Sequence, residues 1–362
     1  MLASFLDSTA KRVAAALLTV AVLAGGAIAL ASRGGDEEVA PPTTTTTTST
    51  TTTTIPPTTT VPVPVAPLTG LVADAGLIGR PALVVKIDNG DPKARPQVGI
   101  NEADVVFEER VEGSVTRLLS VFHSVDSVPV GPVRSARTSD IAIFSALHRP
   151  YFAWSGANAT FAGRIRASNV ADVGYDAQPG EYFRERSRSA PQNLMLKSTA
   201  TAMTFPNEGS APPPPLFTYR AAGAANAHLE PVAGVHVTYG GSAGSAPVDY
   251  RWNGTTWDRF QKGTPHVDTA GRQVSPENVI VQFVNYAPSD VTDQFGVPIP
   301  EAQMVGEGEV WVLTGGGLVQ GRWRKVALEA VTEYLDVDGT PIPLTPGRTW
   351  VALPSPGGAT RL

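Results

Sequence analysis

The sequence contains no cysteine. This absence excludes a disulfide framework, a thiolate zinc site, a cysteine nucleophile and a lipid-modified N-terminal cysteine. Histidine is also scarce, with five residues scattered along the chain, so we expect no metal site and no cofactor. The segment LDVDG (335–339) resembles the start of a calcium loop, but it lacks the third oxygen ligand and the distal glutamate. We therefore expect a hairpin turn there.

Charge is sparse as well. Charged residues make up 17% of the chain and the net charge is -5, so nothing in the composition attracts nucleic acid or an anionic membrane surface. The 35 glycines and 32 prolines indicate many turns and few long helices. With 362 residues, the chain is long enough for two domains of ordinary size.

Residues 1–35 have the pattern of a targeting segment. Lys11 and Arg12 precede Val13–Ala31, an uncharged run of 19 residues that approaches the length needed to span a bilayer. Basic residues before the run favour a single-pass anchor in the cell membrane, with the rest of the chain outside the cytoplasm. Ala29 and Ala31 also fit a signal-peptide cleavage site, so secretion after cleavage at Ala31 stays open.

Residues 36–66 form a low-complexity segment rich in threonine and proline. Between Thr43 and Thr60, 14 of 18 residues are threonine. Such a segment buries too little apolar surface to offset its ordering entropy, so we expect a disordered linker. The composition is typical of an extended stalk that accepts O-glycans, and we expect it to hold a folded head away from the membrane.

The remaining sequence predicts an α+β protein. Residues 67–206 have strand patterns at 82–88, 103–109, 115–123 and 150–156, and helical patterns at 135–149 and 158–168, which indicate an N-terminal mixed α/β domain. Residues 207–229 are proline-rich and predict a hinge. Residues 230–362 show strand and turn signals with almost no helical periodicity, and predict a β-rich C-terminal domain. We expect type I′ turns at Asn253-Gly254 and Asp338-Gly339.

Several segments resemble the YerB-like family, extracytoplasmic bacterial proteins of unknown function. The segments are PLTGL (67–71), KIDNGDPKARPQVGINEADVVFEERVEGSVTRLLSVF (86–122), VGPVRSAR (130–137), YFRERSRSAPQNL (182–194), NVIVQFV (278–284), GRWRK (321–325) and GTPIPLTPGRTWV (339–351). The resemblance covers nearly all of residues 67–353 and implies two YerB-like domains outside the membrane, with no assigned activity. Many relatives carry a lipoprotein cysteine, which this chain lacks, and a histidine where Gln192 stands.

The predicted N-terminal domain is dense in arginine. In GPVRSAR (131–137), Arg134 and Arg137 are three residues apart, so the first turn of a helix would place both on one side. Guanidinium groups bind carboxylates and phosphates through paired hydrogen bonds. We therefore predict an anion-binding site formed by these two residues with Arg95, Arg117, Arg188 and Asn193. The alternative is internal pairing with neighbouring acids, and the two interpretations are compatible.

Three carboxylates are candidates for acid–base catalysis: Asp88, Glu108 and Glu112. The main hypothesis is nevertheless a membrane-tethered binding protein of the cell envelope, which recognises an anionic ligand such as a cell-wall polymer. One alternative is a cell-wall hydrolase that uses Glu108 or Glu112 as acid or base. Another is a scaffold whose β-rich domain docks a membrane enzyme.

Overall fold

The computed structural model describes residues 63–90, 92–221, 223–240, 247–293 and 295–362. The predicted membrane anchor (1–35) and most of the predicted linker lie outside these residues. Among the described residues, no helix is long and apolar enough to cross a membrane. Val65 forms a β-bridge with Val72, and Ala66 is buried, so the described structure includes the last residues of the predicted linker.

The helices of the described structure are short. They are α1 (Ala75–Ile78), α2 (Ser139–Phe144), α3 (Ala159–Ala167) and α4 (Thr199–Ala202), with 3-10 turns at Pro92–Ala94, Ile100–Glu102, Glu112–Ser114, Ser145–Leu147 and Pro179–Glu181. The two helices predicted at 135–149 and 158–168 are present as α2 and α3, each shorter than its pattern. Asn158 caps α3 because its side chain accepts a hydrogen bond from the Thr160 amide.

The strands fall into an N-terminal and a C-terminal series. The first series is β1 (Leu83–Asp88), β2 (Val105–Arg110), β3 (Thr116–Phe122), β4 (Tyr151–Ala153), β5 (Ala171–Asp172), β6 (Tyr182–Arg184) and β7 (Leu194–Leu196). The second series begins with β8 (Glu230–Pro231), β9 (Gly234–Val237), β10 (Val248–Trp252), β11 (Trp257–Gln261), β12 (Thr264–Pro265) and β13 (Asn278–Gln282). It continues with β14 (Tyr286–Thr292), β15 (Pro298–Ala302), β16 (Gly306–Thr314), β17 (Gly317–Lys325), β18 (Glu333–Asp336), β19 (Thr349–Leu353) and β20 (Ala359–Arg361).

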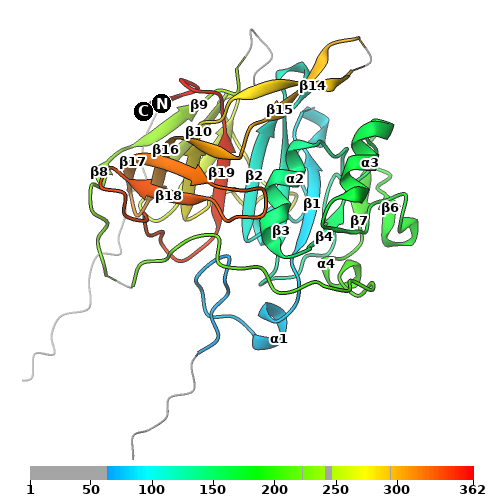
Figure 1. Cartoon of the computed structure of the whole chain (residues 1–362), viewed down its shortest axis with the longest axis horizontal. Helices are drawn as coiled ribbons and strands as arrows, with labels where there is room; N and C mark the ends of the chain where they lie inside the picture. Colours follow the sequence, from blue (N-terminus) through cyan, green and yellow to red (C-terminus); the bar gives the residue numbers. More distant parts are fainter. Residues whose placement is uncertain (1–62, 91, 222, 241–246, 294) are drawn as a thin grey trace, which may run out of the picture. The chain divides into compact units, whose positions relative to one another are not determined.

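One mixed sheet contains strands of both series. Its order is β18-β17-β16-β13-β19-β2-β3-β1-β4-β5, with β8 beside β17. The two series meet where β19 runs parallel to β2, with Val351 opposite Phe107. A second sheet has the order β12-β11-β10-β9-β20, and β14–β15 and β6–β7 are separate hairpins (Figure 1).

The central sheet lies between two apolar layers, because alternate residues of each strand point to opposite faces. Phe107 and the other residues on its face of the sheet pack with Phe144 of α2, on the side covered by α2 and α3 (Figure 1). Val106 and Trp350 face the other way and pack with Trp257 of the second sheet. The α+β prediction, with few helices and a β-rich C-terminal region, is confirmed, and the described residues of 230–362 contain no helix.

The turn predictions need a correction. In the described structure Asn253 and Asp338 do not have positive φ, although Gly254 and Gly339 do, so neither turn is type I′. The Asn253 side chain instead accepts hydrogen bonds from the amides of Thr255 and Thr256, which closes an Asx turn between β10 and β11. Asp336 closes the turn after β18 in the same way, through the amides of Asp338 and Thr340.

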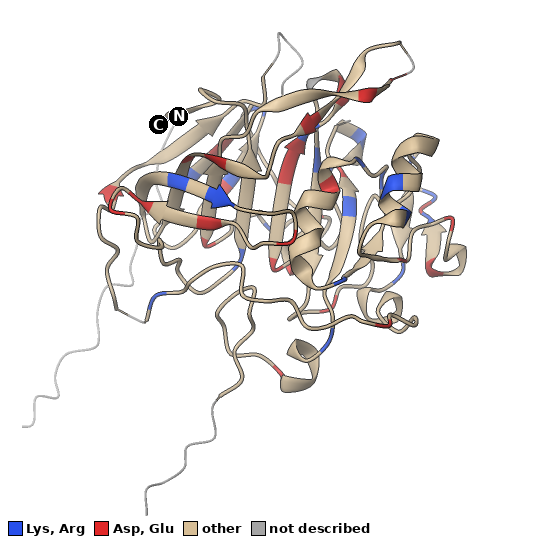
Figure 2. Ribbon diagram, viewed as in Figure 1, with Lys and Arg blue, Asp and Glu red and all other residues tan. Residues whose placement is uncertain are grey.

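A buried ion pair connects the central sheet to the second sheet. Both oxygens of Glu108, on β2, accept hydrogen bonds of 2.9 Å from Arg259 Nη2 on β11, and both side chains are fully buried. Thr116 and Trp350 also donate to the Glu108 carboxylate. Figure 2 shows acidic positions on β2 in the interior of the layered structure. The paired charges compensate one another only while both partners are present.

We predict that Arg259→Met destabilises the fold by about 3–5 kcal/mol, because it leaves the Glu108 carboxylate buried without its counter-charge. Equilibrium urea denaturation measures the change. The double variant Glu108→Gln/Arg259→Met should be less destabilised than Arg259→Met alone.

Arg251→Met is the matched control, because Arg251 lies on the neighbouring strand and is half exposed beside Asp249. Its effect should stay below about 1 kcal/mol. Equal losses of unfolding free energy in Arg251→Met and Arg259→Met would show that the buried ion pair contributes no more to stability than an exposed one.

Candidate functional site

Several of the predicted site residues meet at one end of β1 and β3. Asp88 ends β1 and lies opposite Arg117 at the start of β3. Glu112, Arg134 and Arg137 come from the adjoining loops and complete a group that we call the arginine cluster: Asp88, Glu112, Arg117, Arg134 and Arg137. The cluster is partly buried, because Arg117 and Arg137 are covered while Arg134 and Glu112 reach solvent.

Arg134 and Arg137 do not lie in a helical turn, since α2 begins only at Ser139. The backbone of Arg134 instead donates to the Lys86 carbonyl on β1, and the Arg137 amide donates to the side chain of Asp140. The expected geometry is therefore wrong, although both arginines reach the same cluster. They do so through two different carboxylates.

Glu112 accepts from two arginines. Arg137 binds it through Nε at 2.9 Å and through Nη2, and Arg117 Nη2 lies 3.3 Å away. Burial alone would raise the pKa of Glu112, but the hydrogen bond from Arg137 and the charges of both arginines lower that pKa to about 2. Burial, and then repulsion by Arg137, lower the pKa of Arg117 to about 10. Three guanidinium groups thus share two carboxylates in the arginine cluster.

Asp88 holds the other side of the cluster. Its carboxylate accepts from Arg134 Nε at 3.2 Å, from the Gly90 amide at 3.0 Å and from Gln192 Nε2 at 3.5 Å. Gln192, which stands where many relatives have histidine, therefore faces Asp88. An amide at this position donates a hydrogen bond without adding a titratable group.

Arg95, Arg188 and Asn193 lie beside the arginine cluster. Arg95 donates to the Asn89 carbonyl at 3.0 Å, next to Asp88. Arg188 pairs with Glu185 at 2.8 Å and donates to the carbonyls of Ala94 and Pro96, so it fixes the segment that carries Arg95. Asn193 accepts from Arg184 with its side-chain oxygen. Both internal pairing and clustering of the arginines are therefore observed.

The candidate catalytic carboxylates have structural partners. Glu108 is held by Arg259 in the interior, Glu112 is ionised between two arginines, and Asp88 is buried with three donors. Each of the three candidate acids is therefore engaged by arginine or amide donors of the protein itself.

A buried triad behind the cluster was missed by the sequence analysis. Lys86 on β1 binds Asp140 at 2.6 Å and also contacts Glu109, and all three side chains are fully buried. Burial raises the pKa of Glu109 to about 7 even though Lys86 opposes the shift. Lys86 falls within an apolar strand pattern, and a charge in such a run is the one signal that could have pointed to an interior ion pair.

A polar pocket opens next to Arg95. It has a volume of 190 Å³ and is lined by Arg95, Pro96, Gln261, Thr264, Pro265, His266 and Val267. Arg259 Nη1 donates to Gln261 Oε1 at 2.9 Å, which turns the amide nitrogen of Gln261 away from the ion pair. Among the described residues, this buried nitrogen has no acceptor. His266 bonds Arg259 and Gln97, and burial followed by the charges of Arg259 and Arg95 lowers its pKa well below the usual value.

A group of potential metal ligands lies at the turn expected from LDVDG. Ligand atoms of His228, Asp336 and Asp338 lie within 4.8 Å of one another. His228 bonds Asp338 at 2.7 Å, and one oxygen of Asp336 is committed to the backbone of the turn. His228 and Asp338 are exposed, and their mutual hydrogen bond accounts for their proximity.

We predict that Glu112→Gln lowers stability by about 2 kcal/mol at neutral pH and by progressively less as the pH falls below 5. The pKa of Glu112 in the folded state, about 2, lies below the ordinary value of 4.5. The ionised carboxylate therefore stabilises the fold in full at pH values above 4.5. Protonation removes this contribution as the pH falls through the folded-state pKa. Urea denaturation across this pH range measures it.

Glu307→Gln serves as the comparison, because Glu307 is exposed and lies 3.9 Å from Arg322. Its small effect should not vary with pH in the same way. A constant difference between the wild type and Glu112→Gln at every pH would contradict the assigned role of the two arginines.

Comparison with known proteins supports the resemblance seen in the sequence. Residues 68–211 match the model described as "Protein of unknown function (DUF3048) N-terminal domain", and residues 235–351 match the corresponding C-terminal domain. The chain is 28% identical over 297 residues to a Bacillus subtilis protein described as "Putative lipoprotein YerB", a match that covers 79% of this chain and 85% of that protein.

The fold is likewise similar to a solved structure. The crystal structure of YerB from Bacillus subtilis matches with a TM-score of 0.70 and 22% sequence identity, over 83% of this chain and 99% of that one. The two family models together span more than half of the sequence, and residues 212–234, which include most of the proline-rich segment predicted at 207–229, lie between them. The chain therefore belongs to the DUF3048 family, the YerB-like proteins of unknown function.

Proposed function

We propose that the protein is a membrane-tethered binding protein outside the cytoplasm, and that it recognises a carboxylate or phosphate group in the pocket beside Arg95. The proposal rests on one observation, which is that the side-chain amide nitrogen of Gln261 is buried without a hydrogen-bond acceptor among the described residues. Gln261 lies in the wall of the 190 Å³ pocket. A buried donor without an acceptor costs free energy, and an oxygen ligand in the pocket would remove that cost.

The electrostatics of the pocket favour an anion. Arg95 lines the pocket directly, and a guanidinium group matches the geometry of carboxylate and phosphate oxygens. Burial and the charges of Arg259 and Arg95 lower the pKa of His266 well below its usual value, so its ring is neutral at pH 7. It therefore neither attracts nor repels an anion. The buried Glu108 charge is compensated by Arg259. The charge that a ligand in the pocket would meet therefore comes mainly from Arg95.

The arginine cluster adds to this bias. Arg117, Arg134 and Arg137 carry three positive charges against the two negative charges of Asp88 and Glu112. Asp88 of the cluster and its neighbour Asn89 connect the cluster to Arg95, because Arg134 binds Asp88 and Arg95 binds Asn89. The proposal is that these guanidinium groups, together with Arg95, attract an anion before contact.

The proposed location comes from the sequence and from the relative. The run Val13–Ala31 has the length and flanking charges of a single-pass anchor, and the threonine-rich linker follows it. YerB of Bacillus subtilis is described as a lipoprotein, which is also a membrane-attached class of protein. This chain has no cysteine for a lipid, so a peptide anchor would take the place of the lipid. Outside the cytoplasm, cell-wall polymers offer carboxylates and phosphates.

The test is co-sedimentation of the full chain, held in lipid nanodiscs, with insoluble cell wall purified from Bacillus subtilis. We expect the wild type to sediment with the wall. Gln261→Glu places a negative charge in the pocket and Arg95→Met removes a positive one, so each should reduce the retained protein by about tenfold. Wall material stripped of its phosphate polymers distinguishes phosphate from carboxylate recognition.

Arg322→Met is the matched control, because Arg322 is exposed on β17 and its ion pair with Glu307 is long, at 3.9 Å. It should sediment like the wild type, and circular dichroism confirms that all variants are folded. Equal retention of Gln261→Glu, Arg95→Met and the wild type would contradict the proposal, as would a wild type that stays in the supernatant.

A further inference from the structure

An apolar cavity lies on the α2 side of the central sheet, apart from the polar pocket. Its wider part has a volume of 270 Å³ and lies between residues 215–218 and the strand β18 with the residues that flank it. A narrower part of 20 Å³ continues toward α2 and β17. The two parts share five lining residues, namely Leu216, Phe217, Val331, Thr332 and Tyr334.

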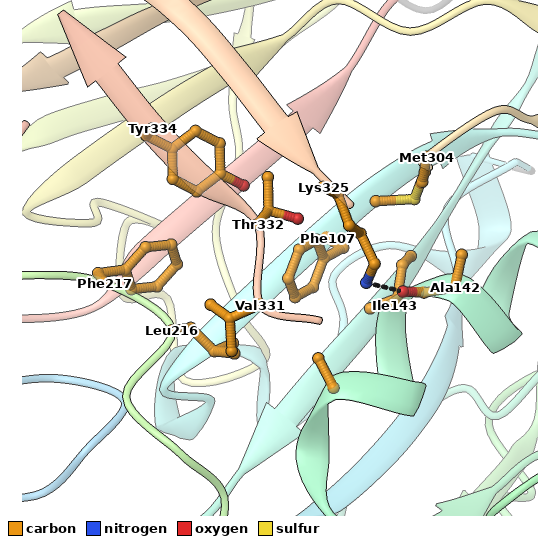
Figure 3. A pocket seen from close by; sticks show the side chains of 11 residues that line it. Phe107, Ala142, Ile143, Leu216, Phe217, Met304, Lys325, Val331, Thr332 and Tyr334 are labelled. Carbon is orange, nitrogen blue, oxygen red and sulfur yellow. Dashed lines mark hydrogen bonds between the residues drawn. The ribbon is translucent and has the colours of Figure 1, made fainter. Parts of the chain in front are cut away.

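The narrow part contains one charged side chain, that of Lys325 at the end of β17. Figure 3 shows its ammonium group among Phe107, Ile143 and Met304, with a hydrogen bond to the carbonyl of Ala142 on α2. That bond measures 2.7 Å, and Lys325 is only 2% exposed. Within the described chain no carboxylate lies within ion-pairing distance of Lys325, and exposed Glu329 acts on it only from farther away.

A lysine in this setting is unusual. A buried ammonium group is normally paired with an acid, because an isolated charge in an apolar environment is costly. Capping the end of α2 explains one of its three donors. Burial lowers the pKa of Lys325 to about 8, so the side chain still carries its charge at neutral pH. The two remaining donors and the charge need a partner that the described residues do not provide.

We propose that this cavity binds a small amphiphile that has a single apolar chain and a carboxylate group, with the carboxylate at Lys325 and the chain in the 270 Å³ cavity. The narrow part has room for an oxygen-sized group beside the ammonium, since a site of 10–15 Å³ holds about one water molecule. The wider part is lined by Phe217, Ile342 and Leu344, which suit a hydrocarbon chain.

The size and entrance of the cavity restrict the ligand further. Ligand pockets commonly measure about 300–1,000 Å³, so this cavity fits one chain of medium length rather than a two-chain lipid. Exposed Pro215 and Pro341 lie at its edge together with Glu333. Glu333, the acid among the residues that line the wider part, is paired with Arg324 at 2.7 Å, so its charge is compensated.

The experiment titrates decanoate into the full chain in lipid nanodiscs by calorimetry, with titrations into empty nanodiscs subtracted. Decanol has the same chain without the charge and reports the apolar contribution alone. We expect the wild type to bind decanoate about tenfold more tightly than decanol. Lys325→Met keeps the apolar stem and removes the charge, so it should remove this preference while decanol binding stays within about twofold.

A second variant tests the cavity without touching the lysine. Val331→Trp fills the shared wall of the two parts and should abolish binding of both compounds. Val337→Trp adds the same side chain at an exposed position of the turn after β18 and should bind like the wild type. Wild-type protein that binds neither compound, or that binds both equally, overturns the proposal. So does a decanoate affinity that Lys325→Met and Val331→Trp leave unchanged.

Discussion

The ion pair between Glu108 and Arg259 is the interaction on which the arrangement of the two sheets depends. Both charges are fully buried, so each must keep its partners for the interior to be stable. Glu108 comes from the middle of the central sheet and Arg259 from the second sheet, so the pair fixes one sheet against the other. The same guanidinium group also positions Gln261 and His266. The wall of the polar pocket is thus a direct consequence of the ion pair.

The two pockets share one physical feature, which is a buried donor with unused capacity. In the polar pocket the donor is the amide of Gln261, and in the apolar cavity it is the ammonium group of Lys325. Their surroundings differ, because basic groups surround the first and hydrocarbon surrounds the second. The two proposed ligands differ for this reason. Candidate acids such as Glu108 and Glu112 are held by arginines, and ligand binding is the function that we propose.

The family comparison and the topology describe the chain at different levels. The N-terminal and C-terminal family models divide the sequence within the proline-rich segment, at residues 212–234. In space, β19 lies between β13 and β2 and joins strands of both regions into one sheet. The C-terminal region therefore supplies a neighbour for β2, and Trp350 of β19 donates to Glu108. Similarity to YerB extends to the fold, whereas the proposed ligand contacts depend on the side chains of this chain.

The sequence by itself determined the class of fold, the positions of most strands, and the membership of the family. It did so because runs of apolar, β-branched residues, as in 82–88 and 278–284, and turn residues such as Gly254 act locally. It also indicated the arginine cluster, since Arg134 and Arg137 are close in the chain. Only the tertiary structure decided the partners of Glu108, Lys86 and Lys325, and the pocket wall at Gln261. Those contacts join residues up to about 180 positions apart, and no local pattern specifies which distant charges will be buried together.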